Sequence, residues 1–317
     1  MLSIHTNYTS LLTQNNLNKT SGAMDQAMQR ISTGFRINSA ADDAAGLQIA
    51  TRLQSQVNGL SVASRNAQDA TSMLQTAEGA FDEMTNISHR MKDLATQAAN
   101  GTNSTSEHAA MQAEWDELQE ELVSIIDNTQ YGSGNNLFAE DVGIFDGEIT
   151  FQIGSSTAET LTIDVSAGLG DVRNAIADLA NIDLSAPAGG APFEDGDDDT
   201  LSGAQLGMNA VDALLNGVAG SDDEGPSEPG PSGAFAMESL GIGALRAQFG
   251  ATINRLDHTV VNLGNMRENT EMAKGRIMDT DYAVESSNMM KNQMLTQMSM
   301  SMLSQANGMS GMVMSLI

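Results

Sequence analysis

Apolar and small residues recur every three or four positions along both ends of the chain. The longest run begins after Leu53 and its members are Val57, Leu60, Ala63, Ala67, Ala70, Leu74, Ala77, Phe81, Met84, Ile87, Met91, Leu94 and Ala98. This spacing is close to the 3.5-residue period of a coiled-coil seam. The pattern therefore predicts one long helix with a buried edge.

Further stripes of the same period predict further helices. They consist of Ile4, Tyr8, Leu11, Met24, Met28 and Ile31; of Met111, Trp115, Leu118, Leu122 and Ile125; of Leu245, Phe249, Ile253, Leu256, Val260 and Leu263; and of Leu295, Met298, Met302, Ala306, Met309, Val313 and Leu316. Many seam positions carry Ala, Ser or Gln, so a single helix buries little apolar surface. Such helices need neighbours, either from their own chain or from other copies.

Polar residues and glycines mark where the helices begin and end. Ser39 and Asp42 have the spacing of a capping-box variant for the helix through Leu47. Asn100-Gly101 favours a helix stop, because both residues adopt the left-handed conformation readily. The acidic and hydroxyl side chains of residues 279–281 offer N-caps for the last helix.

The middle of the chain has a different character. Apolar residues alternate at 149, 151 and 153 and again at 161, 163 and 165, which predicts a β-hairpin. All five prolines lie between residues 187 and 231. Residues 139–238 carry 20 acidic side chains and one basic side chain, Arg173. Burial of so many carboxylates is costly, so this region is expected to face solvent.

Composition excludes several classes of function. The 317 residues include 14 Lys and Arg against 41 Asp and Glu, a net charge of −27, and 4% aromatic residues. Nucleic acids and anionic membranes attract basic surfaces, so neither is an expected partner. Cysteine is absent, which excludes disulfides and thiolate chemistry. The polar N-terminus and the lack of a long apolar run predict neither a secretory signal peptide nor a membrane span.

Catalytic and metal-binding motifs are also missing. The four histidines, His5, His89, His108 and His258, do not form an H-E-x-x-H motif, and neither a G-x-S-x-G nor a P-loop motif occurs. Acidic residues 195, 197 and 199 share the spacing of the first ligands of a calcium loop, but the Gly and Glu that such a loop requires are Thr and Leu. We expect no enzyme activity, no cofactor and no metal site.

Longer motifs at both ends resemble those of the bacterial flagellin family. They are STGFRINSAADDAAG at 32–46, ASRNAQDA at 63–70, QTAEGA at 75–80, QAANGTNS at 97–104, FGATINRLD at 249–257, NLGN at 262–265, RIMDTDYA at 276–283 and SQAN at 304–307. The resemblance covers about residues 1–138 and 239–317. The opening residues 1–7 are most similar to the lateral-type subgroup.

The resemblance implies a mainly α fold, a long-helix coiled-coil bundle formed by the N- and C-terminal segments with a small β-hairpin and a short variable outer insert. It assigns residues 1–33 and 282–317 to an inner terminal-helix domain, 34–46 to a linker, 47–165 and 236–276 to a helical-bundle domain with the hairpin, and 166–235 to a variable acidic outer region, either a small lobe or mostly loops.

The function implied is that of a structural subunit of the extracellular bacterial flagellar filament, exported unfolded by the flagellar type III apparatus. Its partners are then further copies of itself, an export chaperone, and the filament cap and hook–filament junction proteins. A hook–filament junction protein of the same superfamily is the alternative. A protease-bearing flagellin is disfavoured because residues 139–238 contain no histidine.

Two sets of residues are candidates for contacts. The terminal stripes predict a polymerisation surface made of Ile4, Tyr8, Leu11, Met24, Met28, Ile31, Leu295, Met298, Met302, Met309, Val313 and Leu316. The Met-rich tail is either ordinary core filler or a surface that adapts to shifted neighbours. The resemblance also implies recognition of the monomer by the vertebrate flagellin-sensing Toll-like receptor through Arg90, Leu94 and Glu114, although Leu94 equally fits the buried seam.

Overall fold

The computed structural model describes residues 7–132, 134–140, 142–185, 202–217 and 241–314, with side chains as far as residue 308. The chain divides into two compact units, residues 1–59 with 265–317 and residues 60–264. The calcium-like spacing at 195–199, Ile4 and Leu316 lie outside the described residues, and Met309 and Val313 are described as backbone alone.

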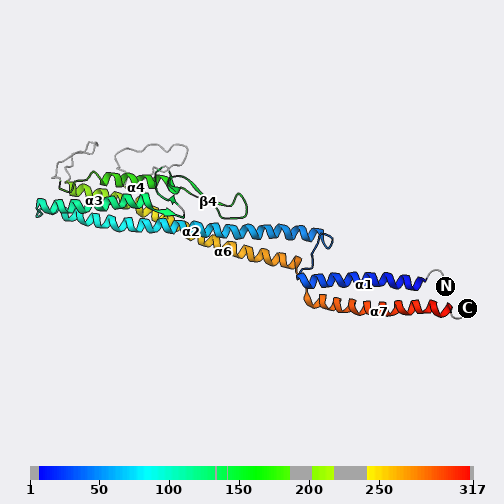
Figure 1. Cartoon of the computed structure of the whole chain (residues 1–317). Helices are drawn as coiled ribbons and strands as arrows, with labels where there is room; N and C mark the ends of the chain where they lie inside the picture. Colours follow the sequence, from blue (N-terminus) through cyan, green and yellow to red (C-terminus); the bar gives the residue numbers. More distant parts are fainter. Residues whose placement is uncertain (1–6, 133, 141, 186–201, 218–240, 315–317) are drawn as a thin grey trace, which may run out of the picture. The chain divides into compact units, whose positions relative to one another are not determined.

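Three long helices build the unit of residues 60–264. Helix α2 (Ala44–Ala98) enters it from the other unit, helix α3 (Thr105–Asn128) follows, and helix α6 (Ile242–Met278) runs alongside α2 (Figure 1). All thirteen predicted seam positions of α2 are at most 9% exposed. The predicted coiled-coil bundle and mainly α fold class are therefore confirmed.

The predicted hairpin is present. Strands β3 (Ile149–Gln152) and β4 (Thr160–Ile163) pair antiparallel, with Ile149 opposite Ile163 and Phe151 opposite Leu161. A second, two-residue hairpin, β1 (Gln130–Tyr131) with β2 (Asn135–Asn136), and a 3-10 turn, η1 (Ile144–Asp146), precede it.

Four phenylalanines tie the segment between α3 and the hairpin to the bundle. Phe81 of α2 and Phe249 of α6 have ring centroids 5.7 Å apart. Phe138 lies 4.8 Å from Phe81, and Phe145 lies 5.2 Å from Phe249. Burial of large aromatic rings stabilises such a cluster strongly. The Arg173 side chain of α4 (Ser166–Leu179) closes it by donating to the Phe138 carbonyl and to Asp146 at 2.8 Å.

The region expected to be a variable outer part contributes to this core. Helices α4 and α5 (Gly203–Asn216) bury apolar side chains in the same cluster as α2, among them Leu169, Val172, Val211 and Leu214. The Trp115 indole of α3 donates to the Leu179 carbonyl at 3.2 Å. The core of the unit thus extends past residue 165, the predicted end of this segment of the helical-bundle domain.

Helices α1 (Tyr8–Thr33) and α7 (Tyr282–Met314) lie side by side and antiparallel in the other unit (Figure 1). The Asn7 side chain caps α1 by accepting from the Ser10 amide at 3.1 Å. Helix α1 ends at Gly34, whose φ of +77° is accessible to glycine without strain. The Asp281 carboxylate accepts from the Ala283 amide at 2.9 Å, which confirms a cap within residues 279–281.

The start of α2 differs from the expected capping box. Ser39 does not cap the helix, because α2 begins at Ala44 and the Asp43 carboxylate accepts from the Gly46 amide at 2.9 Å. Asp42 instead accepts from the Ser39 hydroxyl at 3.0 Å and from the Ser39 amide at 2.9 Å. The Ser39–Asp42 pair therefore closes a turn in the linker, and the next acidic residue caps the helix.

Candidate functional site

The seam between α1 and α7 is made mostly of small and polar side chains. Its buried and half-buried members recur at steps of three and four, and they include Ser10, Thr13, Leu17, Thr20, Met24, Ala27 and Ile31 on α1 and Glu285, Met289, Asn292, Thr296, Ser299, Leu303 and Ala306 on α7. Among the described side chains of the two helices, only Thr13, Ala27, Glu285 and Ala306 are buried, each at most 9% exposed. The pair therefore buries little apolar surface.

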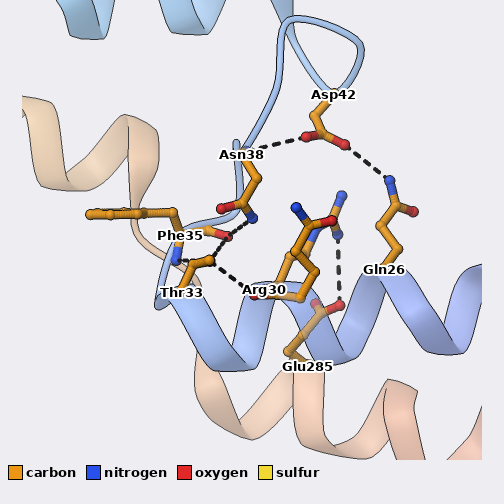
Figure 2. Close-up of polar contacts among 8 residues, drawn as sticks. Gln26, Arg30, Thr33, Phe35, Asn38, Asp42 and Glu285 are labelled. Carbon is orange, nitrogen blue, oxygen red and sulfur yellow. Dashed lines mark hydrogen bonds and ion pairs between the residues drawn. The ribbon is translucent and has the colours of Figure 1, made fainter.

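Polar contacts fix the register of the two helices near both ends of the seam. The Asn7 side-chain amide donates to the Ala306 carbonyl at 2.9 Å, and the Ser10 hydroxyl lies 3.0 Å from the Asn307 side-chain oxygen. At the other end the Arg30 guanidinium lies 3.7 Å from the Glu285 carboxylate, which is 8% exposed (Figure 2). Directional contacts at both ends favour this pairing register over a shifted one.

The linker is bonded to α1 and to the end of α6. The Arg36 amide donates to the Met278 carbonyl at 2.6 Å, and the Thr280 amide donates to the Gly34 carbonyl at 3.0 Å. The Gln26 side chain of α1 donates to Asp42 at 3.0 Å (Figure 2). Hydrogen bonds from Ser39 and Asn38 hold the pKa of Asp42 below its ordinary value.

The apolar face of α7 points away from the seam. Met290, Met294, Met298 and Met302 are 53%, 64%, 68% and 65% exposed. Leu295, Met298 and Met302 of the predicted stripe therefore lie outside the edge that pairs within the chain. Ala306 of the same stripe is 7% exposed and lies in that edge. The pairing edge lies on the more polar positions, because α1 offers small and polar partners there.

The structure divides the predicted polymerisation residues into two groups. Tyr8 at 76%, Leu11 at 51% and Met28 at 45% are exposed, as are Leu295 at 38%, Met298 and Met302. Met24 and Ile31 are half-buried in the α1–α7 seam. These exposed residues of both helices, together with Met290 and Met294 of α7, are open to solvent, and we name them the outer face.

The predicted receptor residues meet in one place on α2 and α3. The Arg90 guanidinium lies 2.6 Å from the Glu114 carboxylate, and the two side chains are 52% and 44% exposed. Leu94 is 2% exposed and belongs to the core. It can affect a surface patch only by fixing the helix that carries Arg90.

The described residues contain no group of three or more His, Asp and Glu side chains placed to hold a metal ion. Within the same ranges, no helix has the length and hydropathy needed to span a bilayer. A capping box at Ser104 and Glu107 was missed in the sequence, although its Ser-x-x-Glu signature is legible there.

Long terminal helices with a polar internal seam and an uncovered apolar face define a class of protein, the helical subunit of a polymeric assembly. Profiles of known families agree with this class. Residues 4–142 match the bacterial flagellin N-terminal helical region, and residues 238–317 match the bacterial flagellin C-terminal helical region.

Two flagellins that this chain matches over almost its full length agree as well. The chain is 36% identical to polar flagellin F of Vibrio parahaemolyticus serotype O3:K6, with 96% of each chain covered, and 35% identical to flagellin A of Vibrio anguillarum, with 100% of this chain and 99% of the relative covered. A crystal structure of Bacillus cereus flagellin matches 63% of this chain and 88% of its own at 26% identity and a TM-score of 0.42.

This chain belongs to the bacterial flagellin family. It is a structural, self-polymerising subunit of the extracellular bacterial flagellar filament, which serves motility, and it is not an enzyme. None of these matches favours the hook–filament junction alternative. The lateral-type assignment from residues 1–7 stays a prediction.

Proposed function

We propose that the outer face of the α1–α7 pair carries the polymerisation of this flagellin, through contacts with the same helices of neighbouring copies. One observation supports the proposal above all others. Leu295, Met298 and Met302 of the α7 stripe are exposed, whereas the apolar stripe of α2 is buried within the chain.

The burial energetics favour the same interpretation. Burying an exposed Met or Leu side chain stabilises an assembly by roughly 1.5–3 kcal/mol. The outer face offers several such side chains, including Tyr8, Leu11, Met294 and Met298. The internal seam offers few, so the pair gains most of its stability when further copies cover it.

A double substitution on the outer face tests this proposal. Met294→Glu with Met298→Glu places two carboxylates where neighbouring copies would bury them, so polymerisation should fail. Both residues are exposed in the single chain, and the helical circular dichroism of the monomer should stay unchanged. Val142→Glu is the matched control, because Val142 is 78% exposed and lies outside the terminal pair.

Electron microscopy and light scattering give the readouts. Filaments of normal length from the double variant refute the assignment of the outer face. Equal loss of polymerisation in the Val142→Glu control also refutes it, because the effect would then follow from added charge anywhere on the surface.

The outer face also supports the proposed contacts with other flagellar proteins. Before assembly, the apolar outer face would be exposed to solvent in the cytosol. An export chaperone bound to α7 would cover it there, until the subunit passes unfolded through the flagellar type III apparatus. Terminal helices open to neighbours also suit the filament cap and the hook–filament junction proteins, which would occupy the two ends of the polymer.

A receptor contact is the second candidate role. The exposed Arg90–Glu114 pair supports recognition of the monomer by the vertebrate flagellin-sensing Toll-like receptor, since a planar guanidinium is a frequent interface anchor. Arg90→Ala should weaken receptor binding by about tenfold or more, whereas Arg65→Ala, another exposed arginine on α2, should leave it unchanged. Equal affinity of the Arg90 variant and the unchanged protein removes Arg90 from the contact.

A further inference from the structure

Methionine is concentrated near the C-terminal end of the chain. The chain has 21 methionines, and nine of them lie between residues 289 and 314. Five in α7, at positions 290, 294, 298, 300 and 302, are at least 53% exposed. In the other unit Met73, Met84, Met91 and Met111 are at most 6% exposed. One chain therefore holds two methionine populations with opposite access to solvent.

Four of the exposed methionines form a continuous row. Met290, Met294, Met298 and Met302 are each four positions apart, and residues at this spacing are neighbours on a helix surface. Such a row is one of the ridges that pack into the groove of a neighbouring helix. We name these four residues the thioether ridge.

From this placement we propose that the thioether ridge is a modification site for hydroperoxides, and that its oxidation before assembly blocks polymerisation. The inference rests on the proposed role of the outer face. The chemistry is the two-electron conversion of methionine to methionine sulfoxide.

The step balances with a hydroperoxide as the sole co-reactant. A sulfur lone pair attacks the terminal peroxide oxygen, the S–O bond forms and the O–O bond breaks. The proton of the hydroperoxide passes to the departing oxygen, which leaves as water or an alcohol. The sulfur is oxidised and the peroxide is reduced, so neither a metal nor a flavin is required.

The product is poorly suited to an apolar contact between helices. A sulfoxide is polar and chiral, and its oxygen is a hydrogen-bond acceptor. Neighbouring copies would present apolar side chains to the ridge, so the acceptor would be buried without a donor. Four such groups in one row would hinder packing along the length of α7.

Assembly changes the access of peroxide to these sulfurs. In the single chain the ridge is open to solvent. In the filament neighbouring copies cover the ridge, and peroxide no longer reaches it. The ridge therefore acts as a checkpoint at which oxidised subunits fail to enter the filament, while subunits already in place resist oxidation.

The experiment uses the full chain, once as monomer and once as filament. Each is exposed to the same limited dose of hydrogen peroxide, peptide mass spectrometry locates the added oxygen, and light scattering and electron microscopy follow polymerisation. We expect sulfoxides at the ridge in the monomer, with Met73, Met84, Met91 and Met111 unmodified, and a critical concentration raised by about tenfold or more. Methionine sulfoxide reductases A and B together should restore polymerisation, since each reduces one epimer.

Conservative variants separate the ridge from other methionines. Met290→Leu, Met294→Leu, Met298→Leu and Met302→Leu combined keep the face apolar and remove the reactive sulfurs. The peroxide dose should therefore leave the critical concentration at the value that this variant has untreated. Met272→Leu, at a methionine on α6 that is 49% exposed, should give no protection.

Each result has a distinct meaning. If untreated wild-type protein polymerises and its ridge-oxidised form polymerises equally well, the inference is overturned. Loss of polymerisation by the peroxide-treated quadruple variant to the same degree as the wild type also overturns it. If the quadruple variant fails to polymerise even without peroxide, the reductase experiment on the oxidised wild type tests the inference instead. Polymerisation restored by the reductases supports the inference, and its absence overturns it. If the variant with Met294→Glu and Met298→Glu polymerises normally while the wild type stays sensitive to peroxide, the result counts against the proposed function instead.

Discussion

At the scale of single residues, Asp42 holds the linker to α1. Its carboxylate accepts from the Ser39 hydroxyl, from the Ser39 and Asn38 amides, and from the Gln26 side chain. These hydrogen bonds favour the charged form, and those from Ser39 contribute most to lowering the pKa of Asp42 below 3.8. The stabilisation is present above that value and is lost as the pH falls through the lower pKa of the folded state.

We therefore expect amide-exchange protection at Asn38 and Ser39 to fall as the pH drops below about 4. Asp42→Asn should weaken this protection at neutral pH and remove its acid dependence. Asp25→Asn, at an exposed acidic residue of α1, is the control and should leave both unchanged. An acid dependence that persists unchanged in the Asp42 variant would assign it to another group.

At the scale of the helix, α2 and α7 carry similar apolar stripes that differ in their exposure to solvent. Leu74 of α2 is 0% exposed and Met298 of α7 is 68% exposed. Leu74→Ala should lower the free energy of unfolding of the monomer by about 2–5 kcal/mol, because it leaves a cavity in a packed core. Met298→Ala should change that free energy by less than about 0.5 kcal/mol and still raise the critical concentration for polymerisation.

Urea denaturation followed by circular dichroism measures the first quantity, and light scattering measures the second. The two variants serve as controls for each other. A large loss of monomer stability in the Met298 variant would mean that α7 packs this face within its own chain, contrary to the exposed fraction.

At the scale of the whole molecule, the net charge of −27 makes each added subunit repel those already assembled. Raising the salt concentration from about 10 mM to about 100 mM shortens the screening length from about 30 Å to about 10 Å. The critical concentration for polymerisation should therefore fall over this range. Sucrose at matched osmolality is the non-ionic control and should not reproduce the effect. Better polymerisation at the lowest salt would contradict the prediction.

The sequence predicted much of this protein because its signals are local. The thirteen seam positions of α2, the hairpin at 149–163 and the stop near residue 100 follow from periodicity and turn chemistry. The family followed from long motifs at both ends. The first residue of α2 lies later in the chain than predicted. Ser39, Asp42 and Asp43 all have side chains that can cap a helix, and the folded backbone determines that Asp43 is the one used.

What the sequence determined by itself is the set of helices, the charge and the family; the choice of contact faces depended on tertiary structure. Periodicity shows that α7 has an apolar edge, but not what covers it. The structure pairs α1 with the polar edge of α7, through Asn7 and Ala306 and through Arg30 and Glu285. It also brings α4 and α5 into the core. Both outcomes depend on residues distant in sequence, whose shapes and hydrogen-bonding groups match only once the chain is folded.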